Sequence, residues 1–278
     1  MEIDYSPAQY EYFFESDAKY RLMPKGRRCG FTHGSANFLI DTAIDNQHIN
    51  ALWVDTVYTN IDRYVDRYFM PLLRELPKGS YDWRQQAKEL KIMNMTIDFR
   101  SADKPENIEG FGYHIFLINE AGIILKGQKG RYLWRNAIVP MLADYAEATV
   151  YIGGTPKGRR DKDGQKNLYF AMCRKAEAGE KGYFIKRVAT DENTFLSDEG
   201  IAEVLKELPE GAVRDQEFYG LFVEEGAGVI RREWFKVENE KLDGRKIRAW
   251  DIAVTEKKHS DYSAGGLLCI SSTDKAHV

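Results

Sequence analysis

The chain has 278 residues, of which 43% are hydrophobic and 13% aromatic, enough for one large or two ordinary folded domains. Its 40 lysines and arginines nearly balance 43 aspartates and glutamates, and the net charge of -3 excludes a general basic coat for nucleic acid. No apolar run approaches the roughly 18–20 residues of a bilayer span, and three widely spaced cysteines fit a reducing cytosol better than a disulfide framework or a zinc site.

The chain begins with an acidic and aromatic stretch, 1–16, that lacks the basic-then-apolar order of a signal peptide, so we expect a soluble intracellular protein. Short apolar runs then alternate with longer amphipathic ones, which predicts an α/β fold with a mostly parallel sheet. The first strand is expected near 20–23, followed by a glycine-rich turn and a helix near 35–45. A second strand, 51–57, precedes a long helical pattern with apolar positions at Ile61, Tyr64, Tyr68, Leu72 and Leu73.

The middle of the chain holds the most apolar strand, expected at 114–118. A strand pair is expected before it at 92–99, and another strand after it at 149–152. Past Pro156 the composition turns polar and basic, and 157–166 is typical of a mobile loop.

The last third of the chain contains a further strand near 183–188 and a helix over 197–208. Ser197 is a suitable N-cap for that helix, and acidic residues follow it near the positive end of the helix dipole. After a second composition shift at 226–243, two strands joined by a polar loop are expected.

Between the first strand and its helix, residues 25–32 read Lys-Gly-Arg-Arg-Cys-Gly-Phe-Thr. A turn of this kind points main-chain N–H groups and a helix N-terminus at an anion. The standard phosphate-binding loop has a lysine directly before its Ser or Thr, where the amine reaches the outer phosphates, but here Phe31 occupies that slot. Lys25 could reach over the phosphates from the front of the loop instead, and Thr32 keeps the hydroxyl that would hold Mg2+.

Two arginines, Arg27 and Arg28, add charge to the same loop and could follow phosphate movement. The alternative interpretation is a basic surface turn in which a glycine only reverses the chain. The loop by itself does not decide between the two.

A second motif, GFGYHIFLINEAG at 110–122, is a hydrophobic strand that ends in Asn119 and Glu120. Apolar strands that end in an acid form the metal-binding and water-activating edge of ATPase sheets, where Glu120 would orient and deprotonate the attacking water. The alternative is an ordinary acidic residue in a loop. Further along, ATVYIGGTPKG at 148–158 is a buried strand whose end places the Thr155 hydroxyl beside the same crevice, where α/β proteins usually bind ligands.

Taken in order, the loop at 25–32, then FRSADKPENIEGFGYHIFLINEAG, YIGGTPKG, QEFYGLFVEEGAGVI and AWDIAV resemble the large terminase subunits of tailed bacteriophages. The resemblance spans nearly the whole chain, and five motifs in order are more specific than any one of them. It implies a RecA-like P-loop ATPase core of the additional-strand, catalytic-glutamate type, joined to an RNase H-like nuclease. By this resemblance, 1–165 is expected to be the ATPase core, 166–243 its lid and linker region, and 244–278 the first β-hairpin of the nuclease domain.

The resemblance also implies roles for individual residues. Lys25 matches the forward-displaced lysine of the deviant Walker A loop found in some terminases, and Glu120 matches the catalytic glutamate of Walker B. Thr155 lies in the coupling motif, which senses the γ-phosphate and transmits hydrolysis to movement. Gln9, in SPAQYEYF, matches the glutamine expected near the adenine, where Tyr5 could assist it. The expected ATP-binding set is Gln9, Lys25, Gly26, Arg27, Arg28, Cys29, Gly30, Phe31 and Thr32, and the expected Mg2+ ligands are Thr32 and Asn119.

Two departures from the family pattern concern the metal and phosphate sites. Walker B normally ends in Asp-Glu, whereas this chain has Asn119 and Glu120. An amide oxygen can accept a hydrogen bond from a metal-bound water but brings no charge, so we expect weaker Mg2+ support unless another carboxylate helps. The second departure, Phe31 in the lysine slot, is tolerable only if Lys25 takes over.

Ring motors of this family also use a basic residue, often from a neighbouring subunit, to stabilise the transferring phosphoryl group. Arg100, in FRSADKP, is our candidate, with Arg131 and Arg135 as others, and an ordinary surface arginine is the alternative interpretation of each. The best local basic patch could contact the DNA backbone or could simply be solvated; it consists of Lys157, Arg159 and Arg160.

Near the C-terminal end, AWDIAVTEKKHSDYSAGG resembles the first hairpin of the terminase nuclease. A strand would deliver Asp251 as the first metal ligand and Asp261 as a second, for Mg2+ or Mn2+. Two-metal cleavage needs several carboxylates around ions roughly 3.5–4 Å apart, and the family takes its other acids from segments well downstream. We therefore expect that this chain, which stops at Val278, does not cut DNA and is part of a longer enzyme.

The function implied is an ATP-hydrolysing motor that drives double-stranded DNA into the procapsid. Its expected partners are double-stranded DNA, the portal protein, the small terminase subunit and further copies of itself in a ring on the procapsid, in the host cell cytoplasm and away from membranes. One alternative is a DNA- or portal-binding adaptor of the same fold that binds nucleotide without hydrolysing it. A helicase would share the ATPase core, but the sequence shows no second tandem core or set of helicase motifs.

Overall fold

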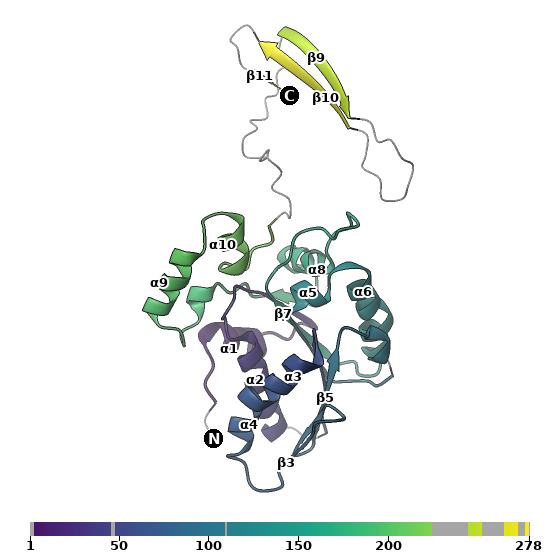
Figure 1. The fold of residues 1–278 in the computed structure, drawn as a ribbon. Coiled ribbons are helices and arrows are strands. Elements are labelled where there is room, and N and C mark those ends of the chain that lie inside the picture. Colours follow the sequence, from purple (N-terminus) through teal and green to yellow (C-terminus); the bar gives the residue numbers. More distant parts are fainter. Residues whose placement is uncertain are drawn as a thin grey trace. The chain divides into compact units, whose positions relative to one another are not determined.

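The structure, a computed structural model, describes residues 3–45, 48–108, 110–223, 244–251, 264–271 and 276–277 (Figure 1). The chain divides into two compact units, Met1–Glu225 and Gly226–Val278. No helix among these described residues is long and apolar enough to cross a membrane.

The first unit is built around an eight-stranded sheet with the strand order β3-β4-β5-β2-β6-β7-β1-β8 (Figure 1). All neighbours from β5 to β8 pair in parallel, and β3 and β4 form an antiparallel extension at one edge. The mostly parallel sheet predicted from the sequence is confirmed. The strands are β1 (Tyr20–Pro24), β2 (Asn50–Asp55), β3 (Tyr81–Arg84), β4 (Glu89–Ile92), β5 (Met95–Ser101), β6 (Ile115–Asn119), β7 (Thr149–Gly154) and β8 (Tyr183–Ile185).

Strand β7 lies between β1 and β6, so an additional strand separates the strand that enters the loop at 25–32 from the strand that ends in Asn119. In register, Pro24 stands beside Gly154, and Gly153 stands beside Asn119. Because parallel strands end at the same edge of a sheet, the loops that follow β1, β7, β6 and β2 meet there. The fold thus brings together, at one edge, segments that lie far apart in the sequence.

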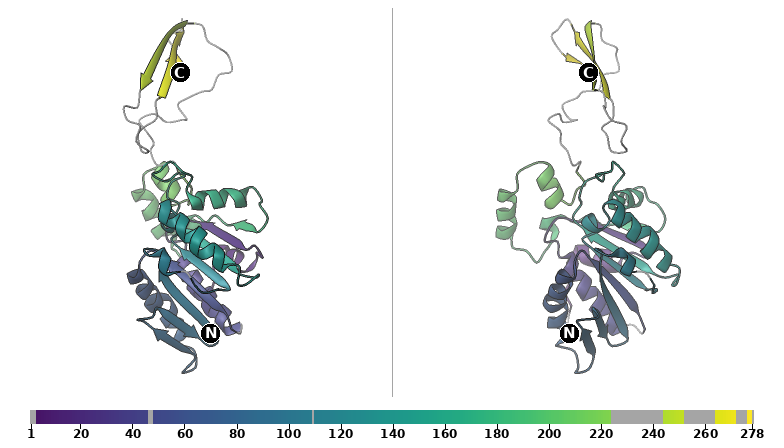
Figure 2. Two further views of the ribbon diagram at one scale, coloured as in Figure 1. Left: turned by 90° about the vertical axis from the view of Figure 1, so that its right-hand side faces the viewer. Right: turned by 45° about the vertical axis from the view of Figure 1, so that its right-hand side comes forward.

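Helices cover both faces of the sheet and bury two separate cores (Figure 2). Side chains of one strand alternate between them, since Trp53 belongs to one core and its neighbours Leu52 and Val54 belong to the other. The α-helices are α1 (Pro7–Phe14), α2 (Phe31–Asp45), α3 (Tyr58–Tyr64), α4 (Met70–Leu73), α5 (Ala121–Ile124), α6 (Gly127–Tyr132), α7 (Val139–Met141), α8 (Leu168–Glu177), α9 (Asp198–Glu207) and α10 (Ala212–Glu217). Short 3-10 turns lie at η2 (Pro105–Asn107) and η4 (Thr190–Glu192).

Two of the helical segments contain a π-helical turn just before a proline. The turn η1 (Val65–Phe69) precedes Pro71, and η3 (Leu133–Ile138) precedes Pro140. Proline lacks an N–H and its ring crowds the carbonyl one turn back, so the wider π turn lets each helix pass the proline. The long helix predicted around Ile61–Leu73 is confirmed, but it runs as α3, η1 and α4 in succession.

Some element boundaries differ from the predicted ones. Helix α2 begins at Phe31, before the predicted start near residue 35, because the loop runs directly into the helix. Helix α1 was not predicted, although its start carries a readable signal: Ser6 caps the helix, Pro7 begins it, and Gln9 completes a capping box.

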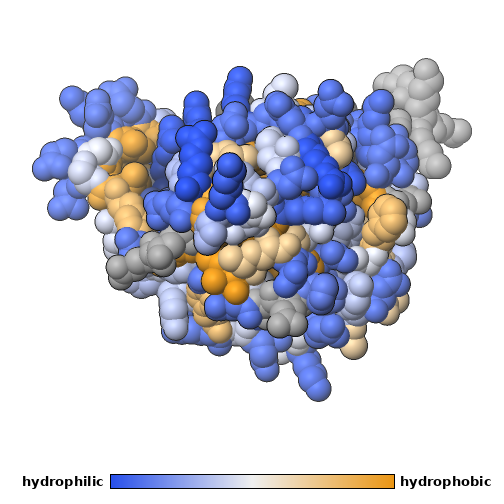
Figure 3. All heavy atoms as spheres, turned by 90° about the horizontal axis from the view of Figure 1, so that it is seen from below, coloured by the Kyte–Doolittle hydropathy of each residue, from blue (hydrophilic) through white to orange (hydrophobic). Residues whose placement is uncertain are grey.

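The second unit contains an antiparallel pair, β9 (Gly244–Asp251) and β10 (Ala264–Ser271), which confirms the two strands expected there. A short strand, β11 (Ala276–His277), pairs with β10. On the face of the molecule shown in Figure 3, hydrophilic side chains surround smaller groups of apolar ones, the usual appearance of a folded domain surface.

Candidate functional site

The loop after β1 is anchored in the core at its rear end. Cys29 and Phe31 are 2% and 1% exposed, and the Phe31 ring packs against Tyr12 and Phe13. A Cβ at Gly153 would lie 2.3 Å from the Phe31 ring, so β7 passes directly over it. A charged amine could not be solvated in this apolar position, which explains why the usual lysine slot holds an aromatic residue. Only the main chain of Cys29 and Phe31 can face a ligand.

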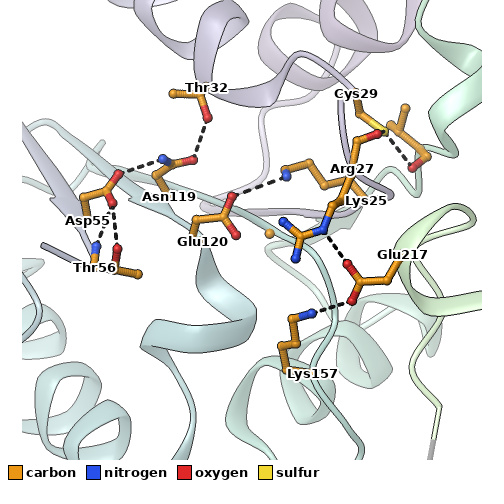
Figure 4. A network of polar contacts seen from close by, with 12 residues as sticks. Lys25, Arg27, Cys29, Thr32, Asp55, Thr56, Asn119, Glu120, Lys157 and Glu217 are labelled. Carbon is orange, nitrogen blue, oxygen red and sulfur yellow. Dashed lines mark hydrogen bonds and ion pairs between the residues drawn. The ribbon is translucent and has the colours of Figure 1, made fainter. Parts of the chain in front are cut away.

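Lys25 leaves β1 at the front of the loop and points toward Glu120 (Figure 4). Its main-chain N–H donates to the carbonyl of Gly154 at 3.2 Å, which fixes the residue at the end of the strand. Lys25 is 6% exposed, and its Nζ lies 3.7 Å from Oε1 of Glu120. The structure therefore brings together the two residues that the sequence placed at the phosphates and at the attacking water.

Glu120 precedes α5 in a left-handed backbone conformation, with φ 62° and ψ 43°. For a residue other than glycine this conformation costs on the order of 1–3 kcal/mol and is concentrated at functional sites. The turn is packed tightly against β7, because a Cβ at Gly154 would lie 2.5 Å from the main-chain nitrogen of Ala121. The result is a carboxylate that is 25% exposed and directed at Lys25.

Asn119, the last residue of β6, connects Thr32 with an acidic residue on the neighbouring strand (Figure 4). The Thr32 hydroxyl donates to Oδ1 of Asn119 at 3.1 Å, and Nδ2 of Asn119 donates to Oδ2 of Asp55 at 2.7 Å. Asn119 and Asp55 are both fully buried. Burial raises the pKa of Asp55, while the hydrogen bonds from Asn119 and Thr56 act against that rise.

Sequence analysis did not identify Asp55, although a signal was present. ALWVD is an apolar strand that ends in an acid, the same pattern as the strand that leads to Glu120. The sequence could not show that β2 lies directly beside β6, with Val54 next to Ile118. The additional carboxylate that the Asn119 departure calls for is therefore available on the adjacent strand.

A segment far along the chain holds the front of the loop through its main chain. The N–H of Gly26 donates to the carbonyl of Val188 at 2.9 Å, and the N–H of Arg27 donates to the carbonyl of Glu217 at 2.7 Å. A Cβ at Gly26 would lie 2.0 Å from the carbonyl oxygen of Phe218, so the two backbones are in direct contact. Glycine at this position is therefore required by space.

Side chains from three other elements donate hydrogen bonds to the loop carbonyls. The bonds run from Thr190 Oγ1 to Arg27 at 2.8 Å, from Asn193 Nδ2 to Arg28 at 2.6 Å and from Gln9 Nε2 to Gly30 at 2.9 Å. Within the described part of the chain, the N–H groups of residues 29–32 donate to no protein acceptor. These N–H groups, at the start of α2, are free to bind an anion.

Gln9 is 2% exposed and has its side-chain amide engaged on both sides. Its Oε1 accepts from the Ser6 N–H at 2.8 Å while its Nε2 donates to the Gly30 carbonyl. Tyr5, the expected assistant, donates to Oδ2 of Asp41 at 3.3 Å. Gln9 thus braces the phosphate loop, and its contact with an adenine remains a prediction.

Glu217, at the end of α10, joins the loop to the segment after β7 (Figure 4). Its carboxylate contacts Arg27 Nε and Lys157 Nζ, each at 2.5 Å. Burial alone would raise the pKa of Glu217, but hydrogen bonds from Lys157, Gln216 and Arg27 outweigh it and lower the pKa to about 2. No motif in the sequence identified Glu217, because its importance depends on where α10 lies.

Thr155 directly follows β7 and is 2% exposed. A Cβ at Gly122 would lie 1.9 Å from the Thr155 carbonyl oxygen, so this residue is packed against the turn that carries Glu120. The basic residues after it have partners of their own: Lys157 binds Glu217, Arg159 donates to the Phe222 carbonyl at 3.0 Å, and Arg160 donates to the Gly164 carbonyl at 2.9 Å.

The three candidate arginines differ in their surroundings. Arg100, on β5, donates to Oδ1 of Asp98 at 3.2 Å. Arg131 is 9% exposed and forms a buried ion pair with Asp161 at 2.5 Å, so in this structure it supports the fold. Arg135 is exposed on η3. A role for any of them in a neighbouring active site remains a prediction.

The expected nuclease ligands stay untested. Asp251 is the last residue of β9, and Asp261 lies outside the described residues. At the loop, the residues present fit Mg2+, which usually takes one or two protein oxygens together with phosphate oxygens. Thr32 and Asn119 offer such oxygens, with Asp55 behind them. Among the described residues there is no cluster of three or more His, Cys, Asp or Glu side chains that could hold a metal without a phosphate.

Comparison with solved structures reveals the fold's relatives. The large terminase ATPase domain of Thermus phage P74-26 aligns with a TM-score of 0.62 at 17% identity, covering 80% of this chain and 94% of that domain. A second large terminase, from a thermophilic bacteriophage, aligns along its longer chain with a TM-score of 0.60 at 14% identity, covering 97% of this chain and 66% of that protein. The HK97 bacteriophage large terminase gives a TM-score of 0.60 at 13% identity, covering 99% and 62%.

At the level of sequence alone, no protein-family model and no curated protein matches the chain. The structural comparison nevertheless shows that the chain has the RecA-like fold of phage large-terminase ATPase domains, as the motif resemblance predicted. The chain spans about two thirds of the length of the second terminase and of the HK97 protein, at 66% and 62%.

Proposed function

We propose that this chain is the ATP-hydrolysing motor of viral DNA packaging, a large terminase that couples hydrolysis to translocation of double-stranded DNA into a procapsid. The observation that carries the proposal is the opposition of Lys25 and Glu120 at the edge of an additional-strand sheet. The fold shared with phage large-terminase ATPase domains supports it. The second of the terminases compared above has been solved with ADP and with ATP-γ-S, which supports a nucleotide as the ligand.

The phosphates of ATP would bind at the start of α2. The free N–H groups of residues 29–32 and the N-terminal end of this 15-residue helix offer an anion site. Lys25 would add the charge that a standard loop takes from the slot of Phe31. Mg2+ bound with the nucleotide would neutralise charge on the outer phosphate oxygens, and Thr32 and Asn119 are the residues placed to hold it.

Glu120 would act as the general base. In the structure its carboxylate contacts the Lys25 ammonium at 3.7 Å, and a triphosphate would compete for that ammonium. Glu120 would then orient a water molecule and accept its proton as the water oxygen attacks the γ-phosphorus. The bond between the γ-phosphorus and its bridging oxygen breaks, and ADP and inorganic phosphate leave.

Thr155 and the basic residues after it would transmit this event to DNA. Thr155 is packed on the Glu120 turn, and Lys157 shares Glu217 with the phosphate loop, so both ends of the site are connected to the same segment. We expect the motor to act as a ring on the procapsid with the portal protein and the small terminase subunit, in the host cytoplasm. Arg100 would complete the site of a neighbouring copy.

Two variants test the assignment of roles. Glu120→Gln should bind ATP like the parent but lose about 10²–10⁴-fold in turnover, the usual contribution of a general base. Lys25→Ala should weaken ATP binding, because the amine that reaches the outer phosphates is gone. Lys78→Ala, at an exposed lysine, serves as the control. Binding of a fluorescent ATP analogue and phosphate release measure both properties, and parent-like hydrolysis by Glu120→Gln would refute the mechanism.

The second candidate function is an adaptor of the same fold that binds nucleotide without hydrolysing it. Phe31 in the lysine slot and Asn119 in the Walker B position are the observations that favour it. Phosphate release by the parent chain, measured with and without double-stranded DNA, separates the two. An adaptor would bind the nucleotide and release no phosphate under either condition.

A further inference from the structure

Asp55 is a fully buried acid at the carboxyl end of β2, outside the motifs considered so far. Every hydrogen bond that it makes is one that it accepts. The donors are Asn119 Nδ2 at 2.7 Å, the Thr56 N–H at 2.7 Å, the Thr56 hydroxyl at 3.2 Å and Trp53 Nε1 at 3.4 Å. Asn60 donates to the Thr56 hydroxyl oxygen at 3.1 Å, which leaves the proton of that hydroxyl for Asp55. Four donors and no acceptor suit the ionised carboxylate.

This carboxylate has no cationic partner among the described residues. The lysine nearest in function, Lys25, pairs with Glu120. A charge buried in a protein is normally paired or placed beside a metal ion, because leaving it alone is costly. Asp55 therefore has a charge that the protein part of the structure does not neutralise.

The carboxylate also fixes the orientation of Asn119. A carboxylate can only accept, so the amide must turn its N–H₂ group toward Asp55 and its oxygen toward Thr32. The Thr32 hydroxyl gives its proton to that oxygen, which leaves the lone pairs of Thr32 for another partner. Hydrogen bonds in such a chain polarise one another, so the charge of Asp55 makes the Thr32 oxygen a better ligand for a cation.

We infer that Asp55 supplies, from the neighbouring strand, the negative charge that Asn119 lacks for holding the divalent cation of a bound nucleotide. The inference rests on the proposed function. Asp55 acts as a positioning residue through Asn119 and Thr32, and it does not contact the substrate.

The test moves the charge back along the chain of hydrogen bonds. In Asp55→Asn the charge is removed, and in the double variant Asp55→Asn with Asn119→Asp it is transferred to the position of Asn119. Binding of a mant-labelled ATP is titrated with Mg2+ and is also measured in EDTA. Asp98→Asn, at a hydrogen-bonded acid on the adjacent strand β5, is the matched control.

Asp55→Asn should need about 10–100-fold more Mg2+ for the same nucleotide binding, the usual effect of losing a residue that supports a metal ligand. Binding in EDTA should be unchanged, and the double variant should return to within about threefold of the parent. An unchanged Mg2+ requirement in Asp55→Asn overturns the inference. So does a loss that is equal in EDTA and is not rescued by the double variant, because that result describes general damage to the fold. If the parent binds no nucleotide at any Mg2+ concentration, the proposed function itself fails.

Discussion

The two ends of the phosphate loop are held in different ways. At the rear, Phe31 is buried among aromatic rings, and Thr32 is bonded to the fully buried Asn119. At the front, Gly26 and Arg27 are held by hydrogen bonds and ion pairs from 188–218, and the Arg27 side chain is 63% exposed. Apolar packing fixes the rear end, whereas the front end depends on charged contacts.

This difference indicates which part of the site can respond to a ligand. Phosphates carry the same sign of charge as Glu217, so an arriving nucleotide would compete with Glu217 for Arg27. Nothing comparable competes for Phe31, because its partners are hydrocarbon. The rear of the loop is thus a fixed platform, and the front is the part that can exchange partners.

The largest effect is expected at the rear. Phe31→Ala should lower the free energy of unfolding by about 3–5 kcal/mol, because it removes a buried ring from a packed cluster. Phe111→Ala, at a phenylalanine that is 69% exposed, is the control and should change stability by less than about 0.5 kcal/mol. Urea unfolding measures both. Equal effects of the two variants would show that the rear of the loop is not held by the core.

A smaller effect is expected at the front. Glu217→Gln should lower the free energy of unfolding at pH 7 by about 1–2 kcal/mol, since exposed Arg27 is screened by solvent. The folded-state pKa of Glu217 is about 2, below its ordinary 4.5, so its contribution is complete above pH 4.5 and is lost as the pH falls toward 2. The difference between parent and variant should therefore shrink over that range.

Unfolding curves collected from pH 7 to pH 2 check this expectation. Glu203→Gln, at an exposed position on α9, should leave the curves parallel to those of the parent. A constant difference between parent and Glu217→Gln at every pH would mean that the ion pairs do not hold the front of the loop.

The smallest effect concerns the turn between the two ends. Glu120→Gly and Glu120→Ala both remove the carboxylate, but only glycine fits the left-handed backbone at φ 62° without strain. Glu120→Gly should therefore be more stable than Glu120→Ala by about 1 kcal/mol. Thermal melting of the two variants side by side gives the difference. Greater stability of the alanine variant would show that this turn carries no strain in solution.

Much of the fold could be predicted from the sequence, because periodic patterns fix strands and helices. The apolar stretch 114–118 and the strand at 149–152 are β6 and β7, and the hairpin of the second unit is present as β9 and β10. Helix α8 was not predicted, since a polar loop precedes it and only part of its surface is buried. Short strands such as β3, with a half-exposed pattern, also leave little trace in the sequence.

The candidate site was predictable where a side chain follows a strand. Lys25, Glu120 and Thr155 each come directly after a buried strand, and the strand order brings them to one edge. Asp55 and Glu217 could not be chosen, because their partners depend on which strands are neighbours and where α10 packs. The occupation of Gln9 by the loop carbonyl is likewise a consequence of tertiary packing.

The contact between Gly26 and Phe218 has a consequence for synthesis of the protein. The loop begins at residue 25, yet the residues that shape its front end are Val188, Thr190 and 217–218. During translation these residues leave the ribosome long after β1 and α2 have been made. A nascent chain ending before them would hold only the rear half of the loop in place, so the capacity to grip phosphate should arise late in synthesis.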